Sequence, residues 1–493
     1  MDTIKTVDSV LDQSKLRFSL TARTPYQFDN VEDLIDNKDD CLLKFLKDFE
    51  ENKAPRIVEL WSYYEGNNAR ISRGDRRLSE DMSDVRARHN FGRYVARFIQ
   101  GYLTGVPITF NYDDGKEESP IDSKLREVNL LNSEESHDST IVLHLAIAGV
   151  AYELLYRNKE DEVRFVSLDP AKTFLIKDMT VARNPLAAVR FYDIPFSETK
   201  KRVVILYTKD KIITYRVEKD VWTQDTVEDH VFGDVPIIEH VNNETYQGDF
   251  ETELDLIDLY DAAQSDTANY MADLNDAILL ITGRMDTGDA DETPEKRLEY
   301  MRAMRRARLL QLIPSVTADG KEGNVDGKYI YKQYDVSGSE SYKDRIKGDI
   351  HTFTNTPNLD DENFSGTQSG EAAKYKLFGL DQVRAIKERF LTKSLRKRYL
   401  LIANILKFTN ELTEDFKPEK LNILFTPNLP RNVQEEIDNA KNLEGVVSKE
   451  TQLSVLSIVK NPKEEIAKMD QENAADPIYD FEQATATTDT EGE

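Results

Sequence analysis

The chain of 493 residues lacks the features that mark secreted and membrane-spanning proteins. It has one cysteine, Cys41, which excludes an intrachain disulfide framework and fits a reducing cytoplasm. Its first residues lack the apolar core of a secretory signal, and its longest apolar runs, such as 141–150, are too short to span a bilayer. We therefore expect a soluble, cytoplasmic protein with no membrane partner.

Basic residues are scarce relative to acidic ones. The chain has 65 Lys and Arg against 91 Asp and Glu, a formal net charge of -26. Proteins that hold DNA tightly without sequence preference neutralise its phosphates with Lys and Arg, so this balance argues against that class. The same excess of acidic residues does not exclude a protein that lets DNA slide past without binding it. With 39% hydrophobic residues, the length predicts two to four structural units with substantial cores.

Catalytic and metal-binding patterns are also missing from the sequence. The six histidines show no HExxH spacing, and a lone cysteine cannot make a CxxC site. No GxSxG elbow is present, and GTQSGEAAK at 366–374 lacks the ending of a phosphate loop. We expect no enzyme activity, no cofactor and no metal. One alternative of another class stays open, a metal-dependent nuclease that holds magnesium on the acidic turn at 286–292.

Hydrophobic periodicity divides the rest into helical and β segments, which together predict the α+β class. Residues 1–40 are polar and acidic and predict a flexible arm. Short β-branched runs from 106 to 247 predict a mainly β unit with one helix at 136–150. Helical spacing predicts helices within 41–105, including 86–102, and at 253–285, 338–353, 370–408 and 431–470.

Two segments, the predicted helix at 253–285 and a helix within 286–335, carry clusters of like charge. At 100° per residue, the helix at 253–285 gathers five aspartates on one face, opposite its apolar side. These are Asp255, Asp258, Asp266, Asp273 and Asp276. They either line a passage or form an ordinary solvated stripe. The insertion at 286–335 contains a basic helix with Arg302, Arg305, Arg306 and Arg308, which could contact DNA phosphates or pair with acids across a subunit interface.

Four groups of segments, in collinear order, resemble the portal proteins of siphophages that infect Gram-positive bacteria. The first is YYEGNNARI at 63–71 with Asn90 and GYLTGVPITF at 101–110. The second is GDVPIIEHVNN at 233–243, followed by QGDFE and LIDLYDAAQSD. The third is NFSGTQSGEAAKYKLFGL at 363–380, and the fourth is GVVSKETQLSVL at 445–456 with NPKEEIAKMDQE after it. Each match alone is weak, but the order and the span of about 50–472 are specific to the family.

The resemblance implies an α+β portal fold in which twelve subunits form a ring around a central channel in the virion. It divides the chain into a flexible N-terminal arm at 1–40, a mainly β wing at 41–252, stem helices at 253–285 and 336–353, a small α/β clip at 286–335, a tunnel loop at 354–369, a spine helix and wing return at 370–429, a helical crown at 430–472 and a disordered acidic tail at 473–493.

The function that the resemblance implies is a conduit at the capsid vertex of a tailed phage, for genome packaging and ejection. The implied partners are copies of the same chain, double-stranded DNA, the terminase large subunit, a head-completion connector protein, and the scaffold and major capsid proteins. Assembly would take place in the host cytoplasm. The expected DNA contact is the tunnel loop, through Asp360, Asp361, Glu362, Asn363 and Phe364. Another head–tail adaptor ring is the structural alternative, although such chains are usually much shorter.

Overall fold

The computed structural model describes residues 16–38, 40–73, 83–116, 119–196, 201–218, 221–273, 278–282, 284–285, 293–307, 312–314, 319–330, 335–358, 377–428, 433–456, 458–459 and 462–475. The chain divides into two compact units. The larger unit comprises 1–358 and 379–426, and the smaller one comprises 359–378 and 427–493. Each unit is described by itself below.

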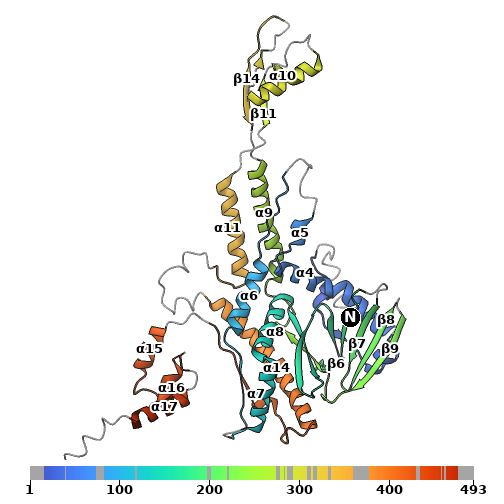
Figure 1. Ribbon diagram of the computed structural model, residues 1–493, viewed down its shortest axis with the longest axis vertical. Coiled ribbons are helices and arrows are strands. Elements are labelled where there is room, and N and C mark those ends of the chain that lie inside the picture. The colour runs from blue at the N-terminus through green and yellow to red at the C-terminus, as the bar shows by residue number, and fades with distance from the viewer. Residues whose placement is uncertain are drawn as a thin grey trace, which may run out of the picture. The chain divides into compact units, whose positions relative to one another are not determined.

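A six-stranded sheet forms one part of the larger unit (Figure 1). In spatial order its strands are β1 (Tyr26–Gln27), β5 (Thr173–Lys177), β6 (Pro185–Asp193), β7 (Lys201–Tyr207), β8 (Lys211–Glu218) and β9 (Val221–Asp229). Only the β1–β5 pair is parallel. Five of these six strands, β5 to β9, lie within the mainly β unit predicted at 106–247.

At β5 and β6 both faces of this sheet are covered, which explains why Phe174, Leu175 and Ile176 follow one another in β5 and are all buried. One face, with Ile176 and Val189, packs against the N-terminal helices α2 (Val31–Asp36), α3 (Cys41–Asp48) and α4 (Ala54–Tyr64). The other face, with Leu175 and Ala188, packs on a second sheet. That three-stranded sheet has the order β10 (Ile237–Val241), β3 (Val150–Arg157) and β4 (Val163–Leu168).

The flexible arm predicted for 1–40 is wrong for the part of it that the structure describes. Residues 20–23 form a 3-10 turn, β1 pairs with β5, and Leu34 of α2 is fully buried. The polar composition misled the prediction because a few apolar side chains, including Tyr26, Phe28 and Ile35, are enough to pack this segment on the sheet. Residues 1–15 lie outside the described part of the chain.

Helices predicted within 41–105 are confirmed, with one change at their end. A π-helical stretch at Phe49–Lys53 joins α3 to α4, and the short α5 (Ala69–Ser72) follows. The amphipathic helix predicted at 86–102 begins only at Phe91, as α6 (Phe91–Thr104), where the Asn90 side chain accepts a hydrogen bond from the Arg93 amide. Residues 83–90 are irregular and bond to another helix, as described below.

Four helices and a small sheet complete the body of the larger unit. The helix predicted at 136–150 is α8 (Glu134–Ala148), and α7 (Pro120–Asn132) precedes it. The long helix predicted from Gly370 is α14 (Phe378–Phe408); residues 370–376 lie outside the described chain. Apolar side chains of α6, α8 and α14, among them Leu103, Leu145 and Leu395, share one core. Strand β2 (Thr109–Tyr112) pairs with β15 (Leu421–Leu424), so the chain returns to this body after α14.

The helix predicted at 253–285 is wrong at its C-terminal end. It is α9 (Leu254–Asp273), and residues 278–282 form strand β11 (Ile278–Thr282), which pairs with β14 (Asp326–Ile330). Continuous apolar runs fit a strand as well as a helix, and the pairing with β14 decides the outcome. Between these strands lie β12 (Arg284–Met285), α10 (Pro294–Ala307) and β13 (Leu312–Ile313), which pairs with β12. The helix predicted at 338–353 is confirmed as α11 (Val336–Phe353), which packs beside α9 (Figure 1).

The smaller unit is helical where it is described. Its helices are α15 (Val433–Asn442), α16 (Lys449–Ser454) and α17 (Pro462–Ala475). The charged helical region predicted at 431–470 is therefore confirmed, and its last helix continues three residues, 473–475, into the segment predicted as disordered. Residues 476–493 lie outside the described chain.

Candidate functional site: the base of helix α9

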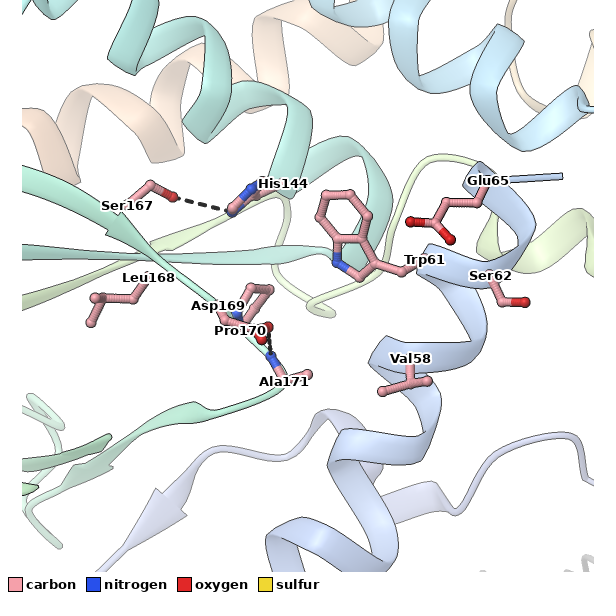
Figure 2. Close-up of a pocket in the computed structure, with 10 residues that line it drawn as sticks. All are labelled: Val58, Trp61, Ser62, Glu65, His144, Ser167, Leu168, Asp169, Pro170 and Ala171. Atoms are coloured by element: carbon pink, nitrogen blue, oxygen red, sulfur yellow. Dashed lines mark hydrogen bonds between the residues drawn. The ribbon is translucent and has the colours of Figure 1, made fainter. Parts of the chain in front are cut away.

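An open pocket of about 560 Å³ lies between α4 and the end of β4 (Figure 2). Its apolar wall is made by Val58 and Trp61 of α4 and by Pro170 and Ala171 of the β4–β5 loop. The His144 ring of α8 meets Trp61 edge to face, with 5.3 Å between ring centroids. Two carboxylates stand among the lining residues, from Glu65 and Asp169.

The polar groups of this pocket are poorly suited to nucleophilic catalysis. Ser167 Oγ lies 3.3 Å from His144 Nδ1, which invites comparison with a serine hydrolase. Burial, however, lowers the pKa of His144 to about 4. A general base works best when its pKa lies near the working pH, so this imidazole would activate serine weakly at neutral pH. The pocket is better suited to holding an apolar group.

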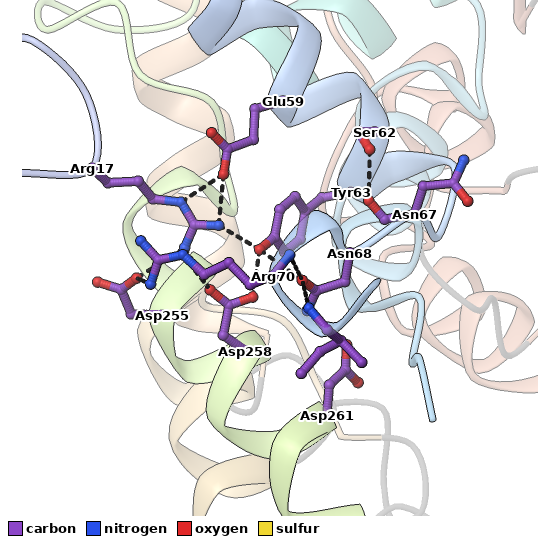
Figure 3. A network of polar contacts seen from close by, with 11 residues as sticks. Arg17, Glu59, Ser62, Tyr63, Asn67, Asn68, Arg70, Asp255, Asp258 and Asp261 are labelled. Carbon is purple, nitrogen blue, oxygen red and sulfur yellow. Dashed lines mark hydrogen bonds and ion pairs between the residues drawn. The ribbon is translucent and has the colours of Figure 1, made fainter. Parts of the chain in front are cut away.

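A polar network that joins distant segments lies at the base of α9 (Figure 3). Arg17 of the N-terminal segment reaches α4, donating from Nε and Nη2 to Glu59 Oε1 at 2.9 and 2.8 Å. Its Nη1 also donates to α9, to Asp255 Oδ1 at 2.8 Å and Asp258 Oδ2 at 2.9 Å. Arg70 of α5 pairs with the same two aspartates, at 3.2 and 3.4 Å. One guanidinium thus ties the N-terminal segment, α4 and α9 together.

Tyr63 of α4 completes this contact from within the core. Its hydroxyl donates to Asp258 and accepts from Arg17. Burial, followed by the hydrogen bond to Asp258, raises the pKa of Tyr63 above its usual value, so the hydroxyl keeps its proton. Buried carboxylates are stable only where donors and cations surround them, and Asp258 has both.

A row of polar side chains continues along α9 and holds residues 83–90. Asp261 Oδ1 accepts from the backbone amide and from Nδ1 of His89, both at 2.9 Å, and Asp261 Oδ2 accepts from Asn68 Nδ2 at 2.9 Å. Farther along, Ser265 Oγ accepts from the Ala87 amide at 3.0 Å, and Asn269 Oδ1 accepts from the Val85 amide at 2.6 Å. Side chains of α9 therefore satisfy backbone amides that would otherwise lack partners.

The start of α9 is fixed by a second, fully buried ion pair. Arg56 of α4 and Glu251 form a bidentate contact, with Nε–Oε1 at 2.7 Å and Nη2–Oε2 at 2.6 Å. The same Nη2 donates to the carbonyls of Ala148 and Tyr246. Bidentate geometry of this kind fixes orientation as well as distance. The chain is thus tied to the sheet-containing body just before α9 begins at Leu254.

A buried cluster of charges also ties α14 to this body. Arg398 is fully buried, with Nε 2.8 Å from Glu153 Oε1 and Nη2 2.7 Å from Asp138 Oδ1. His137 Nε2 and His240 Nε2 lie 2.9 and 3.0 Å from the two oxygens of Glu153. Burial alone would raise the pKa of Glu153, but Arg398, His137 and His240 outweigh it and hold that pKa well below its usual value. The carboxylate therefore stays charged inside the protein.

The structure brings together only part of the site predicted from sequence. Asp255 and Asp258 join the Arg17 network, whereas Asp266 is exposed and Asp273 ends α9. Arg302 and Arg306 are exposed on α10, which also carries Arg305. Asp276, Arg308 and the five tunnel-loop residues, Asp360, Asp361, Glu362, Asn363 and Phe364, lie outside the described part of the chain. Arg17, Tyr63 and Asp261 were not predicted from the sequence, although Asp258, Asp261 and Ser265 repeat at helical spacing.

Among the described residues, no group of histidine, cysteine and carboxylate side chains could hold a metal ion. The acidic turn at 286–292, on which the nuclease alternative depends, is outside those residues. No helix in the described ranges combines the length and the apolar character that crossing a membrane requires.

Comparison with known proteins places these features in a family. A family profile described as "Phage portal protein, SPP1 Gp6-like" matches residues 27–477. The portal protein of Bacillus phage SPP1 is 24% identical over 421 residues, which cover 81% of this chain and 78% of that protein. The portal protein of Clostridium phage phiCD119 is 23% identical over 420 residues, covering 80% and 87%. A chain from the neck of an empty GTA particle is more distant, with 13% identity and a TM-score of 0.42 over 74% of this chain and 90% of its own.

Proposed function

This chain belongs to the SPP1 Gp6-like family of phage portal proteins, and from that premise we propose that its copies close into a ring through which the viral genome passes. It is a portal protein of a tailed phage, and the family is a structural one. The observation that carries the proposal is the family match over residues 27–477, which includes α9, α11 and α14. The ring would stand at the capsid vertex of the virion and assemble in the host cytoplasm.

Exposed apolar side chains on α9 and α11 support ring closure. About half of the surface of four apolar side chains is exposed on these two helices, which pack against each other: Leu259 and Met271 of α9, and Tyr342 and Phe353 of α11. A head-to-tail contact that repeats by rotation would bury such side chains on the next copy and close on itself. Twelve copies are expected from the resemblance to the family.

We propose a slightly different division of the chain from the one that the resemblance implies. The wing would include residues from about 16 onward, because β1 and α2 pack on its sheet. The stem would be α9 and α11, and the clip would begin near β11 rather than at 286. The tunnel loop at 354–369, the spine helix α14 and the crown at 430–472 keep their proposed places.

Passage of DNA depends on weak contact between the channel wall and phosphate. Acidic walls repel phosphate and so favour sliding over binding, consistent with the net charge of -26. Arg17 pairs with Asp255 and Asp258, and Asp266 is the exposed aspartate of α9 that we propose for such a wall. Asp273 and Asp276 keep the role proposed for them from the sequence. The tunnel loop, with Asp360 and Asp361, remains the proposed point of closest contact.

The proposed partners act at different parts of the ring. The clip, with Arg302 and Arg306 exposed on α10, would dock the terminase large subunit and later the head-completion connector. Scaffold and major capsid protein would surround the ring at the vertex. None of these contacts requires a cofactor.

Assembly state is the direct test of the ring. Purified protein should form closed rings with a central hole wide enough for duplex DNA, visible by electron microscopy and measurable as a single mass by mass spectrometry. A monodisperse monomer at every salt and protein concentration would overturn the proposal.

The tunnel loop is tested by charge reversal. Replacing Asp360 and Asp361 with lysine should impair packaging while leaving ring assembly intact, because the positive loop would hold phosphate. If the variant fails to form rings, the loop is architectural and its proposed role is wrong.

A further inference from the structure

We infer that the β5–β6 hairpin tip of one subunit inserts into the pocket between α4 and the β4–β5 loop of the neighbouring subunit. This inference rests on the proposed ring, because it needs a second copy of the chain. The proposed contact lies in the wing. The apolar side chains of the hairpin tip would enter the apolar pocket, and opposite charges would lie at the edge of the contact.

The hairpin tip presents apolar side chains to solvent on a rigid support. Val181 is 103% exposed and Met179 is 68% exposed. Asp178 Oδ1 accepts from the Thr180 amide at 3.2 Å and from the Asn184 amide at 3.0 Å, and the Asp178 amide donates to the Asn184 carbonyl at 2.8 Å. A tip fixed in this way loses little conformational entropy when it binds.

The pocket has the complementary character. Val58, Trp61, Pro170 and Ala171 make an apolar wall, and its volume of about 560 Å³ lies within the usual range for binding pockets (Figure 2). Val58 is itself 56% exposed, so this wall is open to a partner. A chain cannot fill this pocket with its own hairpin tip, because β5 separates the two.

The pocket and the tip lie at opposite ends of the same strand. Pro170 and Ala171 come just before β5, and the tip follows β5, whose five residues span about 17 Å at about 3.3 Å per residue. Two different, complementary surfaces on one subunit are what a head-to-tail contact requires if it is to repeat around a ring.

The charges at the two surfaces are also complementary. Arg183 is exposed at the tip, and Glu65 is exposed at the pocket. The other acid there, Asp169, already pairs with Lys172 at 3.8 Å, so Glu65 is the acid that we match to Arg183. Opposite charges at a rim guide orientation and on-rate more than they add affinity. They select a second copy of this chain over an occupant that is purely apolar or acidic.

Cross-linking between neighbours tests the contact directly. In a Cys41→Ala background, the double variant Val58→Cys with Val181→Cys should give a ladder of covalent oligomers when rings are treated with a short bis-maleimide. Each single variant should give no ladder. As a matched control, Val58→Cys with Leu130→Cys places the second thiol on an exposed residue of α7 and should also give none.

The outcomes separate this inference from the proposed function. Rings that form without a ladder, or a cross-link confined to one chain, overturn the hairpin contact and leave the ring intact. A failure of the wild-type chain to form any ring overturns both. A ladder that also appears with the Leu130→Cys control would show random collision and would equally overturn the contact.

Charge reversal provides a second measurement that does not depend on thiols. Arg183→Glu should weaken association by about threefold per contact, the scale of an exposed ion pair, and adding Glu65→Lys should restore it. Arg126→Glu reverses a comparably exposed charge on α7 and should leave association unchanged. Equal weakening by both single variants, or no rescue in the double variant, would count against the contact.

Discussion

Arg398, in the middle of α14, is a buried cation that forms ion pairs with Glu153 and Asp138. A buried ion pair of this kind adds little net stability compared with apolar packing, but losing one partner is costly because the other charge stays buried. Here two carboxylates depend on one guanidinium. The side chain therefore decides whether α14 can pack on β3 at all.

Replacing Arg398 with methionine should lower the free energy of unfolding by about 3–5 kcal/mol, because Glu153 and Asp138 would be left without their cation. Urea unfolding followed by circular dichroism measures the change. Arg157→Ala is the matched control, since it removes a partly exposed pair with Asp161 and should cost no more than about 1 kcal/mol. Equal effects of the two substitutions would contradict the role given to Arg398.

His144, which lines the pocket, should make the stability of the fold depend on pH. Burial lowers its pKa from 6.5 to about 4, so the folded chain disfavours the protonated ring. Its contribution to stability is complete above pH 6.5 and is lost as the pH falls toward about 4. His144→Phe should therefore lose less stability than the wild type between pH 6.5 and 4, as measured by the unfolding midpoint. Stability curves that stay parallel across this window would contradict the shift.

At the scale of elements, the junction of α8 with β3 depends on two glycines that approach other backbone segments closely. Gly149 has φ +75°, and a Cβ there would lie 2.2 Å from the Tyr246 carbonyl oxygen. A Cβ on Gly248 would lie 2.2 Å from the carbonyl oxygen of Ile147. The helix thus turns into the strand against the segment that leads to α9, and no larger residue fits at either crossing.

Gly149→Ala should lower stability by about 2 kcal/mol or more, from the left-handed backbone and the clash together. Gly101 offers the opposite control on α6, because a Cβ there meets nothing within 4 Å. Gly101→Ala should raise stability by about 0.5–1 kcal/mol through helix propensity. Thermal unfolding of both variants checks the pair, and a loss of stability in Gly101→Ala would show that the helix is constrained there.

Whether a segment is a helix or a strand could be predicted from the sequence wherever the hydrophobic periodicity was strong. The spacing of Val95, Ile99 and Tyr102 predicted α6, and all three are buried. The ends of elements did not follow as well. Residues 83–90 are not helical because Ser265 and Asn269, far along the chain, bond their amides. The strand at 278–282 likewise depends on its pairing with β14, which local pattern cannot show.

The candidate site was less predictable than the fold for the same reason. The aspartates of α9 were recognised, but Asp258 was grouped with exposed residues although it is buried by Arg17 and Tyr63. Arg17 is 241 residues away from Asp258 in sequence, within a segment whose composition suggests flexibility. Pairing over such distances leaves no trace in a single sequence.

At the scale of the whole molecule, net charge opposes assembly. Each chain carries -26, so copies repel one another unless salt screens them. The screening length falls from about 30 Å at 0.01 M to about 8 Å at 0.15 M. Ring formation should therefore become more favourable over this range.

The fraction of chains in rings, measured by analytical ultracentrifugation at fixed protein concentration, should rise between 0.01 and 0.15 M salt by the screening argument. Rings that dissociate steadily as salt is added would show that ion pairs between subunits outweigh the overall repulsion.

The pairing of early with late segments also sets a schedule for biosynthesis. Strand β1 cannot pair until β5 has been synthesised, and Arg17 cannot form its ion pair until Asp258 has been synthesised. Strand β2 likewise pairs only after β15 has been made, where Leu421 is the partner of Tyr112. At about 5–20 residues per second, the ribosome needs about 10–50 s to deliver Asp258 after Arg17. Through that interval the N-terminal segment emerges without its partners, and a nascent chain cannot offer a finished wing to a neighbour. Subunits are thereby kept from joining until most of the polypeptide has been made.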